Sequence, residues 1–128
     1  MQFTSDNAAA AAPEIVAAVA AANTGVAPSY GADPWCARAT DLVRAAFEAP
    51  EAAVYLVATG TAANALALAT LVQPWQAVFC HANAHIHEDE CGAPEFYTAG
   101  AKLVTLPGAH GKIDPAALDR ALSATGSN

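Results

Sequence analysis

Short apolar runs alternate with helix-like segments along most of this chain, and the alternation limits its fold more than any other feature. The runs are AAVYLVAT at residues 52–59, QAVFCH at 76–81 and AKLVTLP at 101–107. A continuous apolar run of this kind predicts a strand buried on both faces. Strands that alternate with helices are joined by crossover connections, so the sequence predicts an α/β fold with parallel strands.

The predicted helices begin with recognisable start signals. Asp33 and Asp114 are good N-cap residues, and each is followed by a proline, which suits the first helical turn. Pro13 and Glu14 open another helix in the same way. The predicted helices cover residues 13–22, 34–48, 61–72, 88–98 (broken or restarted near Pro94) and 114–122. Residues 23–34, rich in Gly and Pro, are expected to form a long irregular loop, which is either a plain surface loop or a functional one.

Charge is unusually scarce in this chain. Of its 128 residues, 55% are hydrophobic and 13% charged, and the net charge is −7; an average globular domain has about 25% charged residues. The few charges predict that much of the surface is covered by another chain or by the rest of a larger protein. The five cations are scattered, so there is no electrostatic footprint for nucleic acid.

Targeting and cysteine patterns point to a reduced cytoplasmic protein. The N-terminus lacks the positively charged region of a signal peptide, and no apolar stretch is long enough to span a bilayer. The three cysteines, Cys36, Cys80 and Cys91, are odd in number and have no repeated spacing, which argues against a disulfide framework. We therefore expect free thiols, no membrane partner and a cytoplasmic location.

The first candidate site lies at Thr59-Gly60-Thr61, where an apolar run ends and a helix begins. A helix N-terminus presents unpaired N–H groups and a partial positive charge, and ligands of parallel sheets bind at the carboxyl ends of strands. Gly60 permits close approach of the backbone, and the threonines add hydroxyl groups. The pattern is compatible with a phosphate cradle, although Thr59 as a simple helix cap is the commoner explanation of such a turn. It is neither a Walker loop nor a GxGxxG motif.

The second candidate site is CHANAHIHEDECG, residues 80–92, which is dense in Cys, His and carboxylate side chains. Its spacings fit no standard zinc template, so we expect no metal site. His85 follows a predicted strand at the same sheet edge as the threonines, where an imidazole can stack on an aromatic ligand or move a proton. A hydrogen-bonded structural histidine is the alternative, and it is the favoured interpretation for His81. A third polar cluster, FTSDN at residues 3–7, offers Ser5 or Asn7 to a small anion.

Taken together, these motifs resemble a known family. The set is FTSDN at 3–7, SYGADP at 29–34, ATGTAAN at 58–64, HANAHIHEDECGAPEF at 81–96 and LPGAHGKIDPAAL at 106–118. In this order and spacing they resemble the N-terminal part of the L-threonine aldolases, pyridoxal-phosphate enzymes of the beta-eliminating lyase group. The resemblance implies the N-terminal part of the large domain of a fold-type-I, aminotransferase-like enzyme. It also implies cleavage of β-hydroxy-α-amino acids, such as threonine, to glycine and an aldehyde.

The resemblance also implies roles for individual residues. Gly60 and Thr61 match the phosphate cradle of the pyridoxal 5'-phosphate cofactor, with Asn64 in support. His85 matches the histidine that stacks on the cofactor ring near the substrate hydroxyl, and Glu90 an acidic active-site position. Ser5 matches a serine near the substrate carboxylate, and Tyr30 a loop tyrosine that reaches a neighbouring subunit. The family implies a homo-oligomer, a dimer of dimers, acting on a small amino-acid substrate.

Family members are longer than this chain, and the resemblance places the cofactor-binding lysine beyond it. Lys102 and Lys112, the only lysines here, lie outside the family's lysine motif. We therefore expect residues 1–33 to form an N-terminal helix and an active-site loop. Residues 34–128 would then be an incomplete cofactor-binding domain, inactive alone. The alternatives are a non-catalytic fragment of the same fold, or a small α/β module that binds a phosphate ligand or a metal.

Overall fold

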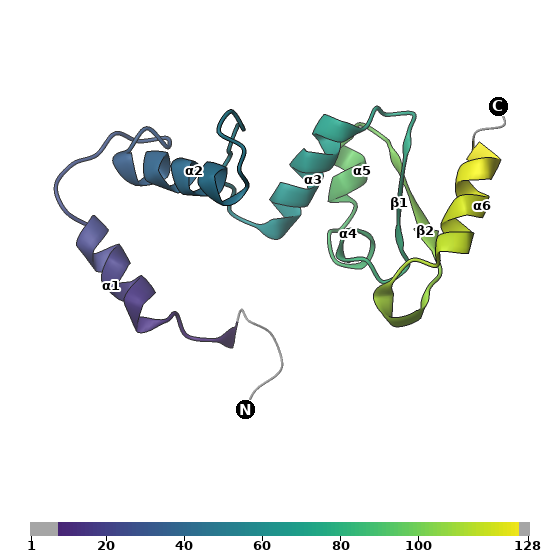
Figure 1. Cartoon of the computed structure of the whole chain (residues 1–128), viewed down its shortest axis with the longest axis horizontal. Coiled ribbons are helices and arrows are strands. Elements are labelled where there is room, and N and C mark those ends of the chain that lie inside the picture. Colours follow the sequence, from purple (N-terminus) through teal and green to yellow (C-terminus); the bar gives the residue numbers. More distant parts are fainter. Residues whose placement is uncertain (1–7, 126–128) are drawn as a thin grey trace. The chain divides into compact units, whose positions relative to one another are not determined.

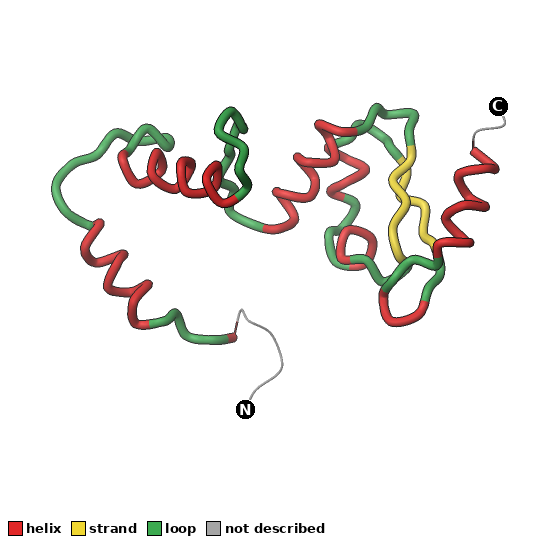
Figure 2. Tube along the Cα trace, viewed as in Figure 1, coloured by secondary structure: helices red, strands yellow, loops and turns green. Residues whose placement is uncertain are grey.

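The computed structural model describes residues 8–125, and its contacts divide the chain into two compact units, Met1–Tyr55 and Leu56–Asn128. Figure 1 labels the helices and strands of each unit, and Figure 2 shows that most of the described chain is helix and loop. The sequence-based division into residues 1–33 and 34–128 stays a prediction. The predicted role of Ser5 falls outside the described residues.

In the first unit, α1 (Pro13–Ala22) and α2 (Pro34–Ala46) begin at the predicted prolines. Asp33 caps α2, because its Oδ1 accepts hydrogen bonds from the backbone N–H groups of Trp35 and Cys36, both at 2.9 Å. Hydrogen bonds from Cys36, above all from its side chain, hold the pKa of Asp33 below its ordinary value. The same contact with Asp33 raises the pKa of the Cys36 thiol, since it favours the protonated form.

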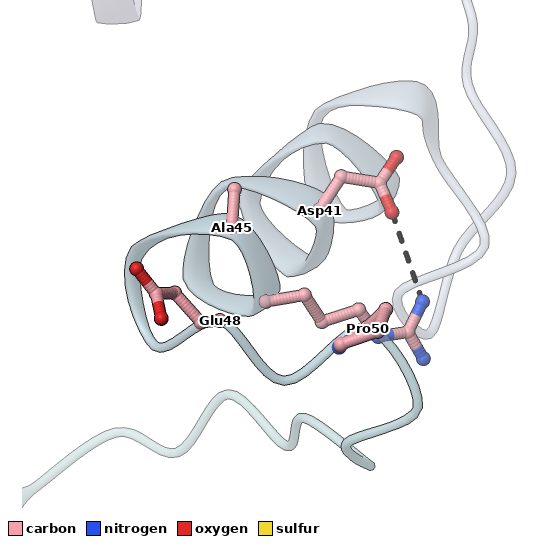
Figure 3. A pocket seen from close by; sticks show the side chains of 5 residues that line it. Asp41, Ala45, Glu48 and Pro50 are labelled. Carbon is pink, nitrogen blue, oxygen red and sulfur yellow. Dashed lines mark ion pairs between the residues drawn. The ribbon is translucent and has the colours of Figure 1, made fainter.

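After α2 the chain reverses, and Arg44 near the end of this helix contacts the segment that follows it. The Nε–H of Arg44 donates to the carbonyl oxygen of Ala52 at 2.9 Å, and its Nη1 lies 3.7 Å from Oδ1 of Asp41. Figure 3 shows this ion pair beside a hollow of about 380 Å³. Two carboxylates and one guanidinium line the hollow, and the guanidinium is already paired with Asp41 and the Ala52 carbonyl, so the hollow does not resemble an anion site. Its lining residues are Asp41, Arg44, Ala45, Glu48 and Pro50.

The predicted strand at 52–59 is wrong for this structure, in which residues 52–57 form no regular element. Their side chains are not buried either: Tyr55 is 83% exposed, Leu56 62% and Val57 41%. A strand exists only where a neighbouring strand takes up its backbone hydrogen bonds. Among residues 8–125, this segment has no such neighbour, since the sheet there contains only two other strands.

The second unit holds two parallel strands, as predicted. β1 (Ala77–His81) pairs with β2 (Lys102–Leu106), with Ala77 opposite Lys102 at one end and His81 opposite Leu106 at the other. The two carboxyl ends therefore meet at one edge of the sheet. The expected burial on both faces is wrong here, because most side chains of both strands are only partly buried. A two-stranded sheet has no central strand to be covered on both sides.

Helices flank the strand pair. α3 (Gly60–Leu71) packs against α5 (Ala93–Tyr97) on one side, and α6 (Pro115–Thr125) lies on the other (Figure 1). The small buried residues of this unit permit close packing of these elements; they include Ala65, Cys80, Ala101 and Ala117. The short 3-10 helix η2 (Ala109–Gly111) was not predicted.

The helical stretch predicted at 88–98, broken or restarted near Pro94, is two short helices, of which the first lies mostly before residue 88. α4 (His85–Glu88) ends before a reversal at Cys91 and Gly92, whose φ angles are 51° and 76°, and α5 then begins. A pair of left-handed residues reverses the chain direction, which glycine permits without strain. The restart near Pro94 was predicted, and Pro94 is fully buried.

Candidate active site

The N-terminus of α3 presents free backbone donors. Thr59 has an extended backbone, and its Oγ1 accepts a hydrogen bond from the N–H of Ala62 at 3.1 Å. In the part of the chain that the structure describes, the N–H groups of Gly60 and Thr61 have no recorded partner. Capping by Thr59 and donors free for an anion are therefore compatible, because the cap satisfies a different N–H group.

A hollow of about 280 Å³ adjoins this turn. A methyl group added at Gly60 would meet no atom within 4 Å, so the backbone there is open to a ligand. Free N–H groups, threonine hydroxyls and open space form a donor set that fits a phosphate group, including that of pyridoxal phosphate. The hollow is lined by Thr59, Thr61, Ala62 and Leu66 of α3 and its cap, and by Ala93 and Tyr97 of α5.

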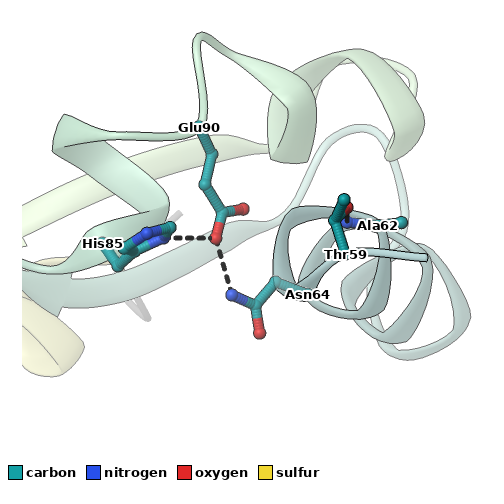
Figure 4. Close-up of polar contacts among 5 residues, drawn as sticks. All are labelled: Thr59, Ala62, Asn64, His85 and Glu90. Atoms are coloured by element: carbon teal, nitrogen blue, oxygen red, sulfur yellow. Dashed lines mark hydrogen bonds and ion pairs between the residues drawn. The ribbon is translucent and has the colours of Figure 1, made fainter. Parts of the chain in front are cut away.

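A second cluster joins α3 to the segment after β1. Oε1 of Glu90 accepts a hydrogen bond from Nδ2 of Asn64 at 2.6 Å and lies 2.8 Å from Nδ1 of His85. Figure 4 shows the carboxylate between the two partners, with Thr59 and Ala62 at the start of the same helix as Asn64. The structure thus brings together three residues that the sequence selected separately.

The members of this cluster differ sharply in exposure. The side chain of Glu90 is fully buried, whereas that of His85 is 63% exposed. The second carboxylate oxygen of Glu90, Oε2, is also buried, and no hydrogen-bond partner is recorded for it in the described chain. Glu90 therefore cannot touch a ligand itself, whereas His85 and Asn64, which is also exposed, can.

His81, at the carboxyl end of β1, has partners for both ring nitrogens. The N–H of Asn83 donates to its Nδ1, and its Nε2 lies 3.0 Å from the carbonyl oxygen of Gly108. These bonds tie the turn after β1 to the turn after β2. The structure therefore agrees with the structural interpretation of His81.

One residue that lines the hollow was missed from the sequence, and one predicted residue belongs to the first unit. Tyr97, which lines the hollow, was not predicted; its only signal was an aromatic residue one helical turn after Pro94. Tyr30 lies in the first unit, exposed and with a positive φ of 60°, and its role stays a prediction. On β1 of the second unit, burial and then the charge of Glu95 raise the pKa of the Cys80 thiol.

Two negative findings concern the described residues alone. Within 8–125, no three His, Cys, Asp or Glu side chains cluster so that they would hold a metal ion. None of the helices in that range combines the length and apolar character that crossing a membrane requires.

Comparison with known proteins gives a consistent family. Residues 2–128 match the family model of the beta-eliminating lyases. The chain is 47% identical over 117 residues to the low specificity L-threonine aldolase of Pseudomonas aeruginosa, and 46% identical to that of another Pseudomonas strain. Each alignment covers 91% of this chain but 34% of the relative, so the chain spans about a third of the length of the curated relatives it matches.

A solved structure agrees. The threonine aldolase of Leishmania major superposes with a TM-score of 0.81 at 33% identity, covering 91% of this chain and 34% of that one. The predicted α/β fold, part of the large domain of a fold-type-I enzyme, is thereby confirmed. The sequence motifs and the parallel strands agree with these comparisons. This chain belongs to the beta-eliminating lyase family.

Proposed function

We propose that this chain is the N-terminal part of a pyridoxal-phosphate-dependent aldolase that cleaves β-hydroxy-α-amino acids, converting threonine to glycine and acetaldehyde. The observation that carries the proposal is the pairing of a donor-lined hollow at Gly60 and Thr61 with an exposed, anchored histidine, linked by Asn64 of the same helix. Relatives named low specificity L-threonine aldolase support the choice of substrate class.

The chain's own residues have distinct parts in this proposal. The N–H groups of Gly60 and Thr61, with the Thr61 hydroxyl, bind the cofactor phosphate. His85 packs on the cofactor ring and exchanges a proton with the substrate hydroxyl. Ser5 binds the substrate carboxylate, and Tyr30 reaches the site of a neighbouring subunit. When bound, the cofactor takes up the electron pair released as the Cα–Cβ bond breaks.

The remaining parts of the proposal concern the whole protein. The lysine that binds the cofactor lies outside this chain, so the 128-residue chain is inactive by itself. The complete enzyme is a cytoplasmic dimer of dimers, whose contacts cover apolar side chains such as Trp75 and Phe96, exposed in this chain. Such coverage accounts for the low proportion of charged residues.

The test compares the product of the whole reading frame with the 128-residue chain. Both proteins are first identified by intact mass and are then incubated with pyridoxal phosphate and L-threonine. Acetaldehyde is followed with a coupled alcohol dehydrogenase, and glycine is measured separately. We expect products only from the longer protein. If that protein binds the cofactor but releases no aldehyde, the aldolase proposal fails, and a phosphate-ligand module becomes the better description.

His85→Ala in the longer protein separates catalysis from folding. Loss of the ring should lower kcat on the order of 10²-fold. The unfolding midpoint should fall only modestly, because the buried Glu90 carboxylate loses one partner and keeps Asn64. His87→Ala, an exposed histidine on the same short helix, is the matched control and should retain activity. Equal kcat in the two variants would remove His85 from the chemistry.

A further inference from the structure

Two histidines near the end of β1 have opposite hydrogen-bond partners. At His81, a backbone N–H donates to Nδ1, so that nitrogen must be the bare acceptor. The other nitrogen, Nε2, faces the carbonyl oxygen of Gly108, which can only accept. His81 is therefore held as the Nε2–H tautomer by two backbone groups.

His85 has the reverse arrangement. Its Nδ1 faces Oε1 of Glu90, and a carboxylate oxygen accepts hydrogen bonds without donating them. The same oxygen already accepts from the amide of Asn64, which is consistent with its acceptor role. Nδ1 of His85 must then carry the proton. In residues 8–125 no partner is recorded for Nε2 of this ring, which is left as the nitrogen with a free lone pair.

Burial decides which role Glu90 can have. The residue is 2% exposed, so it cannot reach a ligand in the hollow or above the sheet edge. Glu90 therefore acts on the imidazole of His85. A carboxylate that accepts a hydrogen bond from one ring nitrogen fixes the tautomer and the orientation of a histidine. Asn64 fixes the carboxylate in turn and joins it to the helix whose first turn has the free N–H groups.

We propose that Glu90 is a positioning residue that locks His85 in the Nδ1–H tautomer, leaving Nε2 as the proton-accepting nitrogen. The sequence-based hypothesis places Glu90 among the catalytic residues. In this proposal Glu90 does not touch the substrate and acts only by orienting His85. The catalytic consequence rests on the proposed aldolase function, in which Nε2 would accept the proton of the substrate hydroxyl. The tautomer itself does not depend on that function, because it follows from contacts within this chain.

The test reads the tautomers directly in the 128-residue chain, with no cofactor or substrate. Long-range ¹H–¹⁵N NMR spectra are recorded at successively higher pH until the ring shifts of both histidines no longer change. We expect His81 to give the Nε2–H pattern and His85 the Nδ1–H pattern. The Hδ1 proton of His85 should also show an NOE to the side chain of Glu90. An Nε2–H pattern at His85, or no such NOE, would overturn the proposal.

Two substitutions show whether Glu90 is the cause. Glu90→Met keeps a buried side chain of similar length but removes the acceptor, so His85 should change to the Nε2–H pattern. Glu90→Gln keeps a carbonyl acceptor and should retain Nδ1–H. The His81 pattern reports folding in both variants, since none of its partners is altered. Retention of Nδ1–H at His85 in a folded Glu90→Met variant would show that Glu90 does not set the tautomer.

Kinetics of the longer protein give a separate readout. Glu90→Met should lower kcat/KM on the order of 10²-fold with cofactor absorbance retained, and Glu90→Gln should recover most of the loss. Equal losses in both variants would contradict the positioning role. If the longer protein has no aldolase activity, the proposed function fails, whereas the NMR result still decides the tautomer proposal.

Discussion

Thr59 caps the helix that follows it: its Oγ1 accepts a hydrogen bond from the backbone N–H of Ala62 at 3.1 Å. This contact satisfies one of the N–H groups that a helix start leaves unpaired, and the N–H groups of Gly60 and Thr61 stay available. The cap and the proposed phosphate cradle thus use different atoms of the same turn. Their contributions can be separated by substitution.

Thr59→Ala should destabilise α3 by about 1 kcal/mol, in the ordinary range for loss of an N-cap side chain. Amide hydrogen exchange along Gly60–Leu71 measures the effect. Thr59→Ser keeps the hydroxyl oxygen and should exchange nearly as slowly as the wild type. Unchanged protection in the alanine variant would show that the side-chain cap contributes nothing to the helix.

Thr61→Val should weaken pyridoxal phosphate binding by about 1–3 kcal/mol, because a hydroxyl bond to a charged phosphate is lost while the side-chain shape is kept. Equilibrium dialysis of the cofactor measures the change. Thr70→Val is the matched control, since that hydroxyl donates to the carbonyl of Ala67 within the same helix. Equal affinity in both variants would remove Thr61 from the cradle.

The cap of α2 should respond to acid at an unusually low pH. Hydrogen bonds from Cys36 lower the pKa of Asp33 from its ordinary value of 3.8. Because the folded pKa is depressed, the stabilisation is present above the ordinary pKa and is lost as pH falls through the folded value. The amide shifts of Trp35 and Cys36 should therefore titrate with a midpoint below 3.8.

Asp33→Asn is the control for this titration, because Asn also caps helices but does not titrate. Its amide shifts at Trp35 and Cys36 should stay flat over the same pH range. A wild-type midpoint at or above the ordinary aspartate value would contradict the prediction.

Gly108→Ala should disrupt the turn that follows β2. A methyl group at this position would overlap the carbonyl group of Lys112, which is backbone and cannot rotate away. The displacement would also break the bond between His81 and the Gly108 carbonyl. Urea unfolding should show a lower midpoint for this variant. Gly60→Ala, where a methyl group meets open space, should unfold at or above the wild-type midpoint.

Local features were predictable from the sequence because local chemistry forms them. Pro13, Asp33 and Pro34 set the starts of α1 and α2 through fixed φ angles and side-chain caps, and all three act within a few residues. The strands at 77–81 and 102–106 were found from their apolar runs. The run at 52–59 is just as apolar and forms no strand, because pairing depends on a neighbouring strand that no local pattern specifies.

By itself the sequence determined the starts of α1, α2 and α6, the two strands, the threonine-glycine turn and the family. It also singled out Asn64, His85 and Glu90, but not that one carboxylate oxygen would join the other two residues. Only the tertiary structure decided this, by packing α3 against α5 and so bringing Asn64 within 2.6 Å of a carboxylate 26 positions later. Periodicity and capping act over a helical turn, whereas a buried hydrogen bond depends on where distant segments pack. For the same reason, the opposite hydrogen-bond partners of His85 and His81 are seen only in the tertiary structure.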